Sequence, residues 1–201
     1  MQWLPGLPCF LRELEWDYPR TSPTMARMAL VTFLRGVNVG GHRSFRPSVL
    51  ANELKDYGVV NIGAAGTFVV CSRLSQKRWR SELLPHIPFE AKVMICTGQE
   101  LIAAASNNPF DDETPPSDMV RFVSILSKRP RLSPSIPVCI PASGKWLVRI
   151  LSRHNRFLFG LYRREMRAIT SLGVIDDLFG MPATTRNWNT IRSILKVLER
   201  A

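Results

Sequence analysis

Two groups of polar residues in this chain have the types and spacing that anion binding requires. The first is the run Gly36-Val37-Asn38-Val39-Gly40-Gly41-His42-Arg43, between an apolar segment and a helical pattern. Backbone amides of a glycine-rich turn and a following helix N-terminus can hold a phosphate. The run only approaches a nucleotide fingerprint, because Asn38 and the pair His42-Arg43 stand at positions where those motifs differ. Two main interpretations stay open: a tight structural turn, or an anion loop that uses Arg35, Asn38 and Arg43.

The second group is the run Thr184-Thr185-Arg186-Asn187-Trp188-Asn189-Thr190, at the start of a closing amphipathic helix. A helix N-terminus beside Arg186 favours an anion. In the alternative interpretation the hydroxyl and amide groups cap the helix, Trp188 anchors it in the core, and Arg186 pairs internally. If the two runs converge, a cleft for a small anionic ligand would be lined by Arg35, Asn38, Arg43, Arg186, Asn187 and Asn189.

A third group lies in a basic hairpin. Two strand-like runs, 145–153 and 156–163, flank His154-Asn155. With that dipeptide as the turn, position 149 faces 160 and position 153 faces 156. One face would carry the apolar side chains Trp146, Val148, Ile150, Phe157, Phe159 and Leu161. The other face would carry Lys145, Arg149, Arg153, Arg156, Tyr162 and Arg164.

That second face suits a phosphate backbone, and Tyr162 is available to stack on a base. In the alternative interpretation this is an ordinary solvated polar face of an antiparallel sheet, with no ligand. The charge distribution draws attention to this region. The chain of 201 residues has a formal net charge of +11, from 27 Lys and Arg against 16 Asp and Glu. The formal charges of all residues before Arg121 sum to zero, so the whole surplus of positive charge lies beyond Val120.

Signals for catalysis or metal binding are weak. The three histidines have no metal-binding spacing, and the adjacent carboxylates 111–113 stand beside prolines, as in a solvated loop. The cysteines are scattered, which fits reduced thiols better than a zinc site or a disulfide framework. We therefore predict no metal and no cofactor, and leave enzymatic activity undecided. The cysteines are Cys9, Cys71, Cys96 and Cys139.

The elements that must position these residues follow from hydrophobic spacing. The first part has the order strand, helix, strand, strand, helix, strand, which predicts a ferredoxin-like split βαβ unit. Its expected elements are 29–35, 47–58, 59–62, 67–71, a helix capped by Ser75, and 91–97. After a proline-rich break we expect a strand at 119–127, the hairpin, a helical segment at 168–180, and the closing amphipathic helix.

The chain is thus predicted to be α+β, with an N-terminal ferredoxin-like unit and a smaller α+β unit containing the antiparallel hairpin and C-terminal helices. The expected divisions are 1–28, a loose extension or mis-annotated start; 29–106; a linker at 107–118; and 119–201. The first residues lack the basic start and uninterrupted apolar stretch of a signal peptide, so we expect a cytoplasmic protein. No apolar run is long enough to span a membrane.

Two motifs carry a family resemblance. With Leu34-Arg35-Gly36-Val37-Asn38-Val39-Gly40-Gly41 and Ala183-Thr184-Thr185-Arg186-Asn187-Trp188-Asn189-Thr190, the chain resembles the bacterial family called domain of unknown function 1697. Asn108-Pro109-Phe110 looks like a third landmark. The resemblance implies a cytoplasmic α+β protein and no established activity. The chain departs from the family at Ala64-Ala65-Gly66-Thr67 and around Phe159–Arg164, as a divergent member would.

Two functions remain under consideration. The preferred one is a binding module for nucleic acid or another polyanion, through the basic face of the C-terminal hairpin. The alternative is binding or turnover of a small anionic ligand in a cleft between the two units. The sequence leaves the ligand and the oligomeric state undecided.

Overall fold

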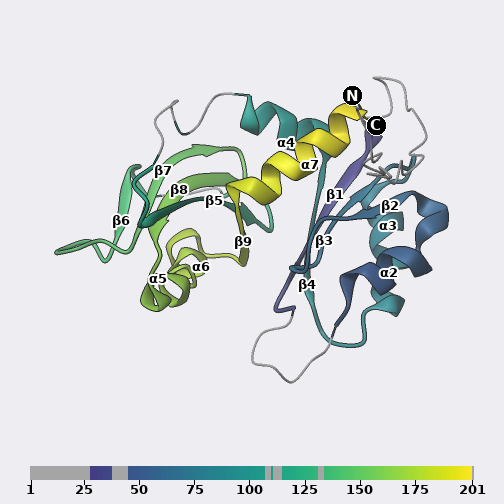
Figure 1. The fold of residues 1–201 in the computed structure, drawn as a ribbon, viewed down its shortest axis with the longest axis horizontal. Coiled ribbons are helices and arrows are strands. Elements are labelled where there is room, and N and C mark those ends of the chain that lie inside the picture. The colour runs from purple at the N-terminus through teal and green to yellow at the C-terminus, as the bar shows by residue number, and fades with distance from the viewer. Residues whose placement is uncertain (1–27, 38–44, 107–109, 111–114, 131–133, 201) are drawn as a thin grey trace, which may run out of the picture.

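The computed structural model describes residues 28–37, 45–106, 110, 115–130 and 134–200, and these form two antiparallel sheets with helices around them (Figure 1). The α+β prediction is confirmed. The first sheet has the strand order β2-β3-β1-β4. Its strands are β1 (Leu30–Arg35), β2 (Val59–Asn61), β3 (Thr67–Val70) and β4 (Lys92–Thr97).

Helices follow β1 and β3, so the predicted element order of the first part is observed. They are α2 (Pro47–Glu53) with the 3-10 turn η1 (Lys55–Tyr57), and α3 (Gln76–Leu83) with η2 (Leu84–His86). Ser75 caps α3 as expected, because its Oγ accepts a hydrogen bond from the Arg78 backbone N at 3.2 Å. The name ferredoxin-like for this unit stays a prediction.

Helix α4 (Gly98–Ala105) was not expected, although the sequence carries a signal for it. Thr97 and Glu100 form a capping box: the Glu100 backbone N donates to Thr97 Oγ1 at 3.1 Å, and the Thr97 backbone N donates to Glu100 Oε2 at 2.8 Å. The spacing Thr-x-x-Glu before an apolar run is the usual sign of such a helix start.

The second sheet has the order β6-β7-β8-β5-β9. Its strands are β5 (Met119–Leu126), β6 (Val138–Ile140), β7 (Val148–His154), β8 (Phe157–Arg163) and β9 (Ala183–Asn187). Three helices complete this part: α5 (Met166–Ser171), α6 (Val174–Phe179) and α7 (Trp188–Arg200). Two strands are corrections, since β6 lies in an expected proline-rich loop and β9 contains the threonines expected to cap α7.

Both faces of each sheet are covered, which gives three hydrophobic cores (Figure 1). An outer core joins the first sheet to α2 and α3, and another joins the second sheet to α5 and α6. The central core lies between the sheets and includes side chains of α4 and α7. Within the described residues, no helix is long and apolar enough to cross a membrane.

The pairing of β7 with β8 corrects the predicted hairpin. The turn residues are Asn155-Arg156, so His154 faces Phe157 and Arg149 faces Leu161. Asn155, the first of the two turn residues, has φ of 53°, and a positive φ at this position is what the two-residue hairpin turns of types I′ and II′ require. The prediction placed the turn one residue too early, which shifts the pairing by two residues and leaves the same side chains on one face. The irregularity between Ile150 and Ser152 shifts the pairing by one residue, and this shift puts Val148 and Ile150 on the face opposite Phe157 and Phe159.

The predicted division of the hairpin into one apolar and one basic face is therefore wrong. Val148 and Ile150 pack in the outer core of the second sheet, whereas Phe157 and Phe159 pack in the central core. Because both faces of β7 and β8 carry core side chains, no face of this hairpin is left for a continuous basic surface.

Candidate functional site

A cavity of about 560 Å³ lies where the start of β5, the end of β8 and the start of α7 meet. Strand β9 pairs with β5 only from Phe122 to Leu126, so Met119–Arg121 extends beyond it. The chain turns from β9 into α7 at this point. The polar lining residues are Arg121, Tyr162, Arg164, Asn187, Asn189 and Arg192. Apolar surface comes from Phe110, Pro115, Met119, Val120 and Trp188.

The local structure fixes where these side chains lie. Tyr162 is paired with Val120 across the β5–β8 ladder, and Arg164 follows the last residue of β8. Asn189 and Arg192 are three residues apart in α7 and so share one side of its first turns. Asn187 caps this helix, since its Oδ1 accepts a hydrogen bond from the Thr190 backbone N at 2.8 Å.

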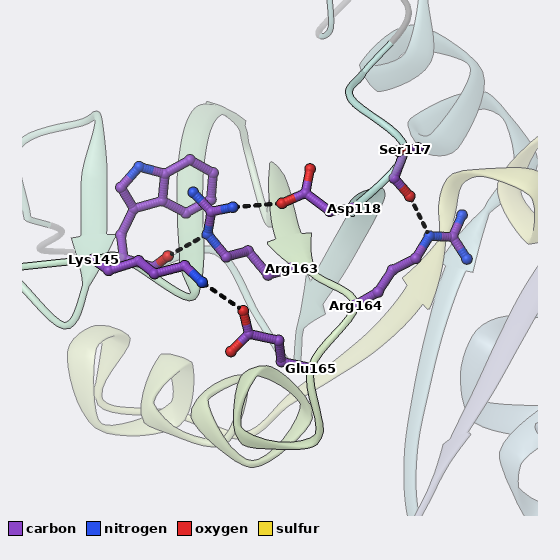
Figure 2. Close-up of polar contacts among 7 residues, drawn as sticks. Ser117, Asp118, Lys145, Arg163, Arg164 and Glu165 are labelled. Atoms are coloured by element: carbon purple, nitrogen blue, oxygen red, sulfur yellow. Dashed lines mark hydrogen bonds and ion pairs between the residues drawn. The ribbon is translucent and has the colours of Figure 1, made fainter.

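Arg164 and Arg192 bring positive charge to the cavity from two different elements. Arg164 donates from Nε to the Ser117 carbonyl oxygen at 2.9 Å. In Figure 2 its guanidinium points away from the ion pairs around Arg163 and Lys145. Within the described part of the chain, its terminal nitrogens have no partner. Arg192 is exposed and has no hydrogen-bond or ion-pair partner among the described residues. Both guanidinium groups can therefore take a ligand.

The third arginine lies against an aromatic cluster. The Arg121 guanidinium is 5.3 Å from the centre of the Phe110 ring, within cation–π range. Phe110 in turn packs edge-on against Trp188, with ring centres 5.1 Å apart. No acidic side chain is among the described residues that line the cavity. The lining is thus cationic and aromatic.

Tyr162 completes the polar wall with a neutral hydroxyl group. Burial raises its pKa above the ordinary 10.0, and the positive charge of Arg164 opposes part of that rise. The phenol is therefore protonated at neutral pH and can donate one hydrogen bond and accept others.

Those residues of the predicted small-ligand cleft that the structure describes do not form one site. Arg186 is 8% exposed, and Arg35 pairs with Asp176 of α6. Asn38 and Arg43 lie outside the described residues. Asn187 and Asn189 line the cavity described above. Of the six predicted cleft residues, the structure brings these two together there.

The Arg186 guanidinium is held entirely by internal acceptors. Its hydrogen bonds reach β1, β3, the turn before β3 and its own strand. The acceptors are Leu34 O at 2.6 Å, Thr67 Oγ1 at 2.7 Å, Ala65 O at 2.8 Å, Thr184 Oγ1 at 2.9 Å and Thr185 O at 2.9 Å. Burial lowers its pKa to about 10, so it remains charged at neutral pH. This arrangement matches the internal pairing that the sequence left open for it.

Most of the residues predicted to form a basic face have internal partners. Figure 2 shows Lys145 paired with Glu165 at 2.9 Å. Arg156 donates to the Ile95 carbonyl oxygen of the first sheet at 2.9 Å. The Arg149 Nε is an exception, since it is buried without a hydrogen-bond partner among the described residues, and Arg153 is exposed near the hairpin turn. The other two members, Tyr162 and Arg164, line the cavity.

Sequence reasoning missed seven of the described lining residues of this site as ligand contacts, and four of them have charged or aromatic side chains. Arg192 lies one helical turn beyond Asn189, so the helical period of α7 contained the signal. Trp188 and Phe110 were read as a core anchor and as a family landmark, and both do pack in the central core. No local sequence pattern marks Arg121 as a site residue, because its place at the cavity depends on where β9 ends.

Comparison with known proteins gives a family. The family model described as protein of unknown function (DUF1697) matches residues 28–136. The chain belongs to the DUF1697 family. The matched segment runs from the start of β1 to just before β6 and includes Phe110 and Arg121, whereas the cavity residues of β8 and α7 lie beyond it. No curated protein and no solved structure matches the chain.

Proposed function

We propose that this DUF1697 protein binds an anionic ligand in the cavity between β5, β8 and α7. The observation that carries the proposal is the pair Arg164 and Arg192: their guanidinium groups line one cavity and have unused donors. Guanidinium groups bind carboxylates and phosphates through two parallel hydrogen bonds.

The surroundings strengthen that charge. Both arginines are exposed, and a concave surface that carries charge of one sign raises the local concentration of a counter-ion. The cavity volume of about 560 Å³ falls in the range that small-molecule sites occupy. The N-terminal end of α7, a helix of 13 residues, adds partial positive charge at the same wall.

This proposal takes the anionic-ligand alternative and combines parts of both earlier candidate sites. Tyr162 and Arg164 came from the predicted polyanion surface, and Asn187 and Asn189 came from the predicted cleft. Polyanion binding along the hairpin has less support, because Lys145 and Arg156 are engaged with internal partners.

The test uses inorganic pyrophosphate as the probe and isothermal titration calorimetry as the measurement. The double variant Arg164→Glu/Arg192→Glu should bind pyrophosphate at least about tenfold more weakly than the wild type, a loss of about 1.4 kcal/mol. The matched control, Arg78→Glu/Arg153→Glu, reverses two exposed arginines elsewhere and changes the net charge equally.

The control should bind as the wild type does. An equal loss in both double variants would mean that affinity follows net charge alone, and it would overturn the proposal. So would the absence of measurable pyrophosphate binding by the wild type at low salt, where exposed charges act most strongly. Equal melting temperatures of the two variants would show that folding does not explain a difference.

A further inference from the structure

The cavity lining also includes aromatic side chains. Tyr162 from β8 and Trp188 from α7 line the same cavity, and both are half-buried. Trp188 packs edge-on against Phe110 and Phe159, at 5.1 and 6.3 Å between ring centres. Tyr162 is tilted by 44° against Phe122, with ring centres 6.0 Å apart. These contacts hold both rings in place at the cavity wall, so they lose little freedom when a planar group packs on them.

Hydrogen-bonding groups line the cavity as well. Asn189 is exposed at the first turn of α7 and lines the cavity. Its carboxamide has both donor and acceptor atoms, which is what the edge of a nucleobase requires. The Tyr162 hydroxyl adds a second donor and acceptor. The cavity therefore combines planar apolar surface, amide groups and guanidinium groups.

We propose that the anionic ligand is a nucleoside phosphate, an inference that rests on the anion site proposed above. The base packs on Tyr162, and the phosphate binds Arg164 and Arg192. An aromatic side chain contributes little to the binding affinity for an inorganic anion, whereas base stacking on aromatic side chains contributes substantially to the affinity for a nucleotide. A sugar phosphate without a base would use only half of this lining.

A nucleoside phosphate can be a free nucleotide or one unit of a single strand. Lys196 follows Arg192 by four residues on α7, is exposed, and has no ion-pair partner among the described residues. It lies one turn further along the helix, where a second phosphate of a strand would need a cation. Binding of a strand should therefore depend on Lys196, and binding of a mononucleotide should not.

The experiment compares three probes by calorimetry: adenosine monophosphate, ribose 5-phosphate and a short oligothymidylate. Wild-type protein should bind adenosine monophosphate about fivefold or more tightly than ribose 5-phosphate, which is the lower end of the stacking contribution. Tyr162→Leu should weaken adenosine monophosphate binding more than ribose 5-phosphate binding and so remove most of that advantage. Tyr162→Phe retains the ring and should keep most of the advantage. Tyr57→Leu, at a half-buried tyrosine at the end of the 3-10 turn η1, is the matched control.

The outcomes separate the two proposals. Equal affinity for adenosine monophosphate and ribose 5-phosphate, both lost in Arg164→Glu/Arg192→Glu, would overturn the nucleoside and keep the anion site. Lack of binding by every probe, pyrophosphate included, would overturn both. Tighter oligothymidylate binding that Lys196→Glu reverses would assign the nucleoside phosphate to a strand; unchanged binding in Lys196→Glu would assign it to a free nucleotide. An effect of Tyr57→Leu equal to that of Tyr162→Leu would count as a folding effect and overturn the stacking role.

Discussion

Arg186 shows how one residue can carry charge and still be part of the protein interior. Its guanidinium spans the gap between the sheets and donates to the carbonyl oxygens of Leu34 and Ala65. It also lies over the Phe33 ring at 5.8 Å. A lysine could not serve these acceptors, because an ammonium group lacks the planar fork of donors. We regard Arg186 as the link that fixes β9, and with it the start of α7, against the first sheet.

Replacing Arg186 with methionine should destabilise the protein by about 3 kcal/mol or more, because several buried acceptors lose their donor at once. The measurement is the free energy of unfolding from urea denaturation. Arg78→Met is the control, since Arg78 is exposed and its distance to Glu82 is 3.8 Å; the expected change is below about 0.5 kcal/mol. Similar values for the two variants would show that the Arg186 hydrogen bonds contribute little net stability.

At the scale of elements, the β7–β8 hairpin depends on close approach of its neighbours. Gly160 of β8 lies opposite Ile150 of β7 and Phe122 of β5. A Cβ atom added there would lie 2.3 Å from the Arg149 carbonyl oxygen and 2.7 Å from the Phe122 ring. Because the closest atom belongs to the backbone of the next strand, it cannot rotate away. Because Gly160 has no side chain, the Phe122 ring can pack directly against the backbone of β8 at this position.

Gly160→Ala should therefore destabilise the protein by about 1–3 kcal/mol, the usual range for overpacking a core. Thermal and urea unfolding would measure this. The same substitution at Gly173, which is exposed and has φ of −63°, is the control; its Cβ would lie 3.2 Å from the Thr170 carbonyl oxygen, so it should cost clearly less than Gly160→Ala. If Gly160→Ala were as stable as the wild type, the strands would have to be further apart than described.

At the scale of the whole molecule, the central core belongs to both sheets. Phe33 of β1 and Phe159 of β8 are each at most 1% exposed and lie in this one core. Further links between the sheets come from Arg186 and from the Arg156 bond to Ile95. The two predicted units thus bury side chains against each other, and neither has this core alone.

We expect the two halves to unfold together. Phe159→Ala in β8 should cost about 3–5 kcal/mol and accelerate amide hydrogen exchange in β1 as much as in β8. Exchange measured by mass spectrometry after proteolysis would resolve the two strands. Leu84→Ala, at a leucine 44% exposed, should leave both unchanged. Faster exchange confined to β8 would instead support two independently folding domains.

The hydrophobic period of the sequence determined much of the fold. Strands β1, β3, β4 and β5 lie within one residue of their predicted bounds, and α2, α3 and α7 lie where helices were expected, because their apolar spacing is regular. The elements that were missed have local signals that hydrophobic spacing does not read. Helix α4 begins with a capping box, and β6 lies between prolines.

The site could be predicted only in part, for a physical reason. Sequence patterns found Tyr162, Arg164, Asn187 and Asn189, but placed them in two separate sites. Their common cavity depends on the end of β9 and on the direction in which α7 leaves it, which are properties of long-range packing.

By itself, the sequence determined the α+β class, most elements, the family motifs and the part of the chain that holds the positive surplus. Only the tertiary structure decided which cations remain available. Arg156 and Arg186 are used between the sheets, whereas Arg164 and Arg192 face a cavity. The local hydrophobic period predicts which side chains share a face of a strand. What covers each face depends on contacts between segments more than a hundred residues apart in the sequence.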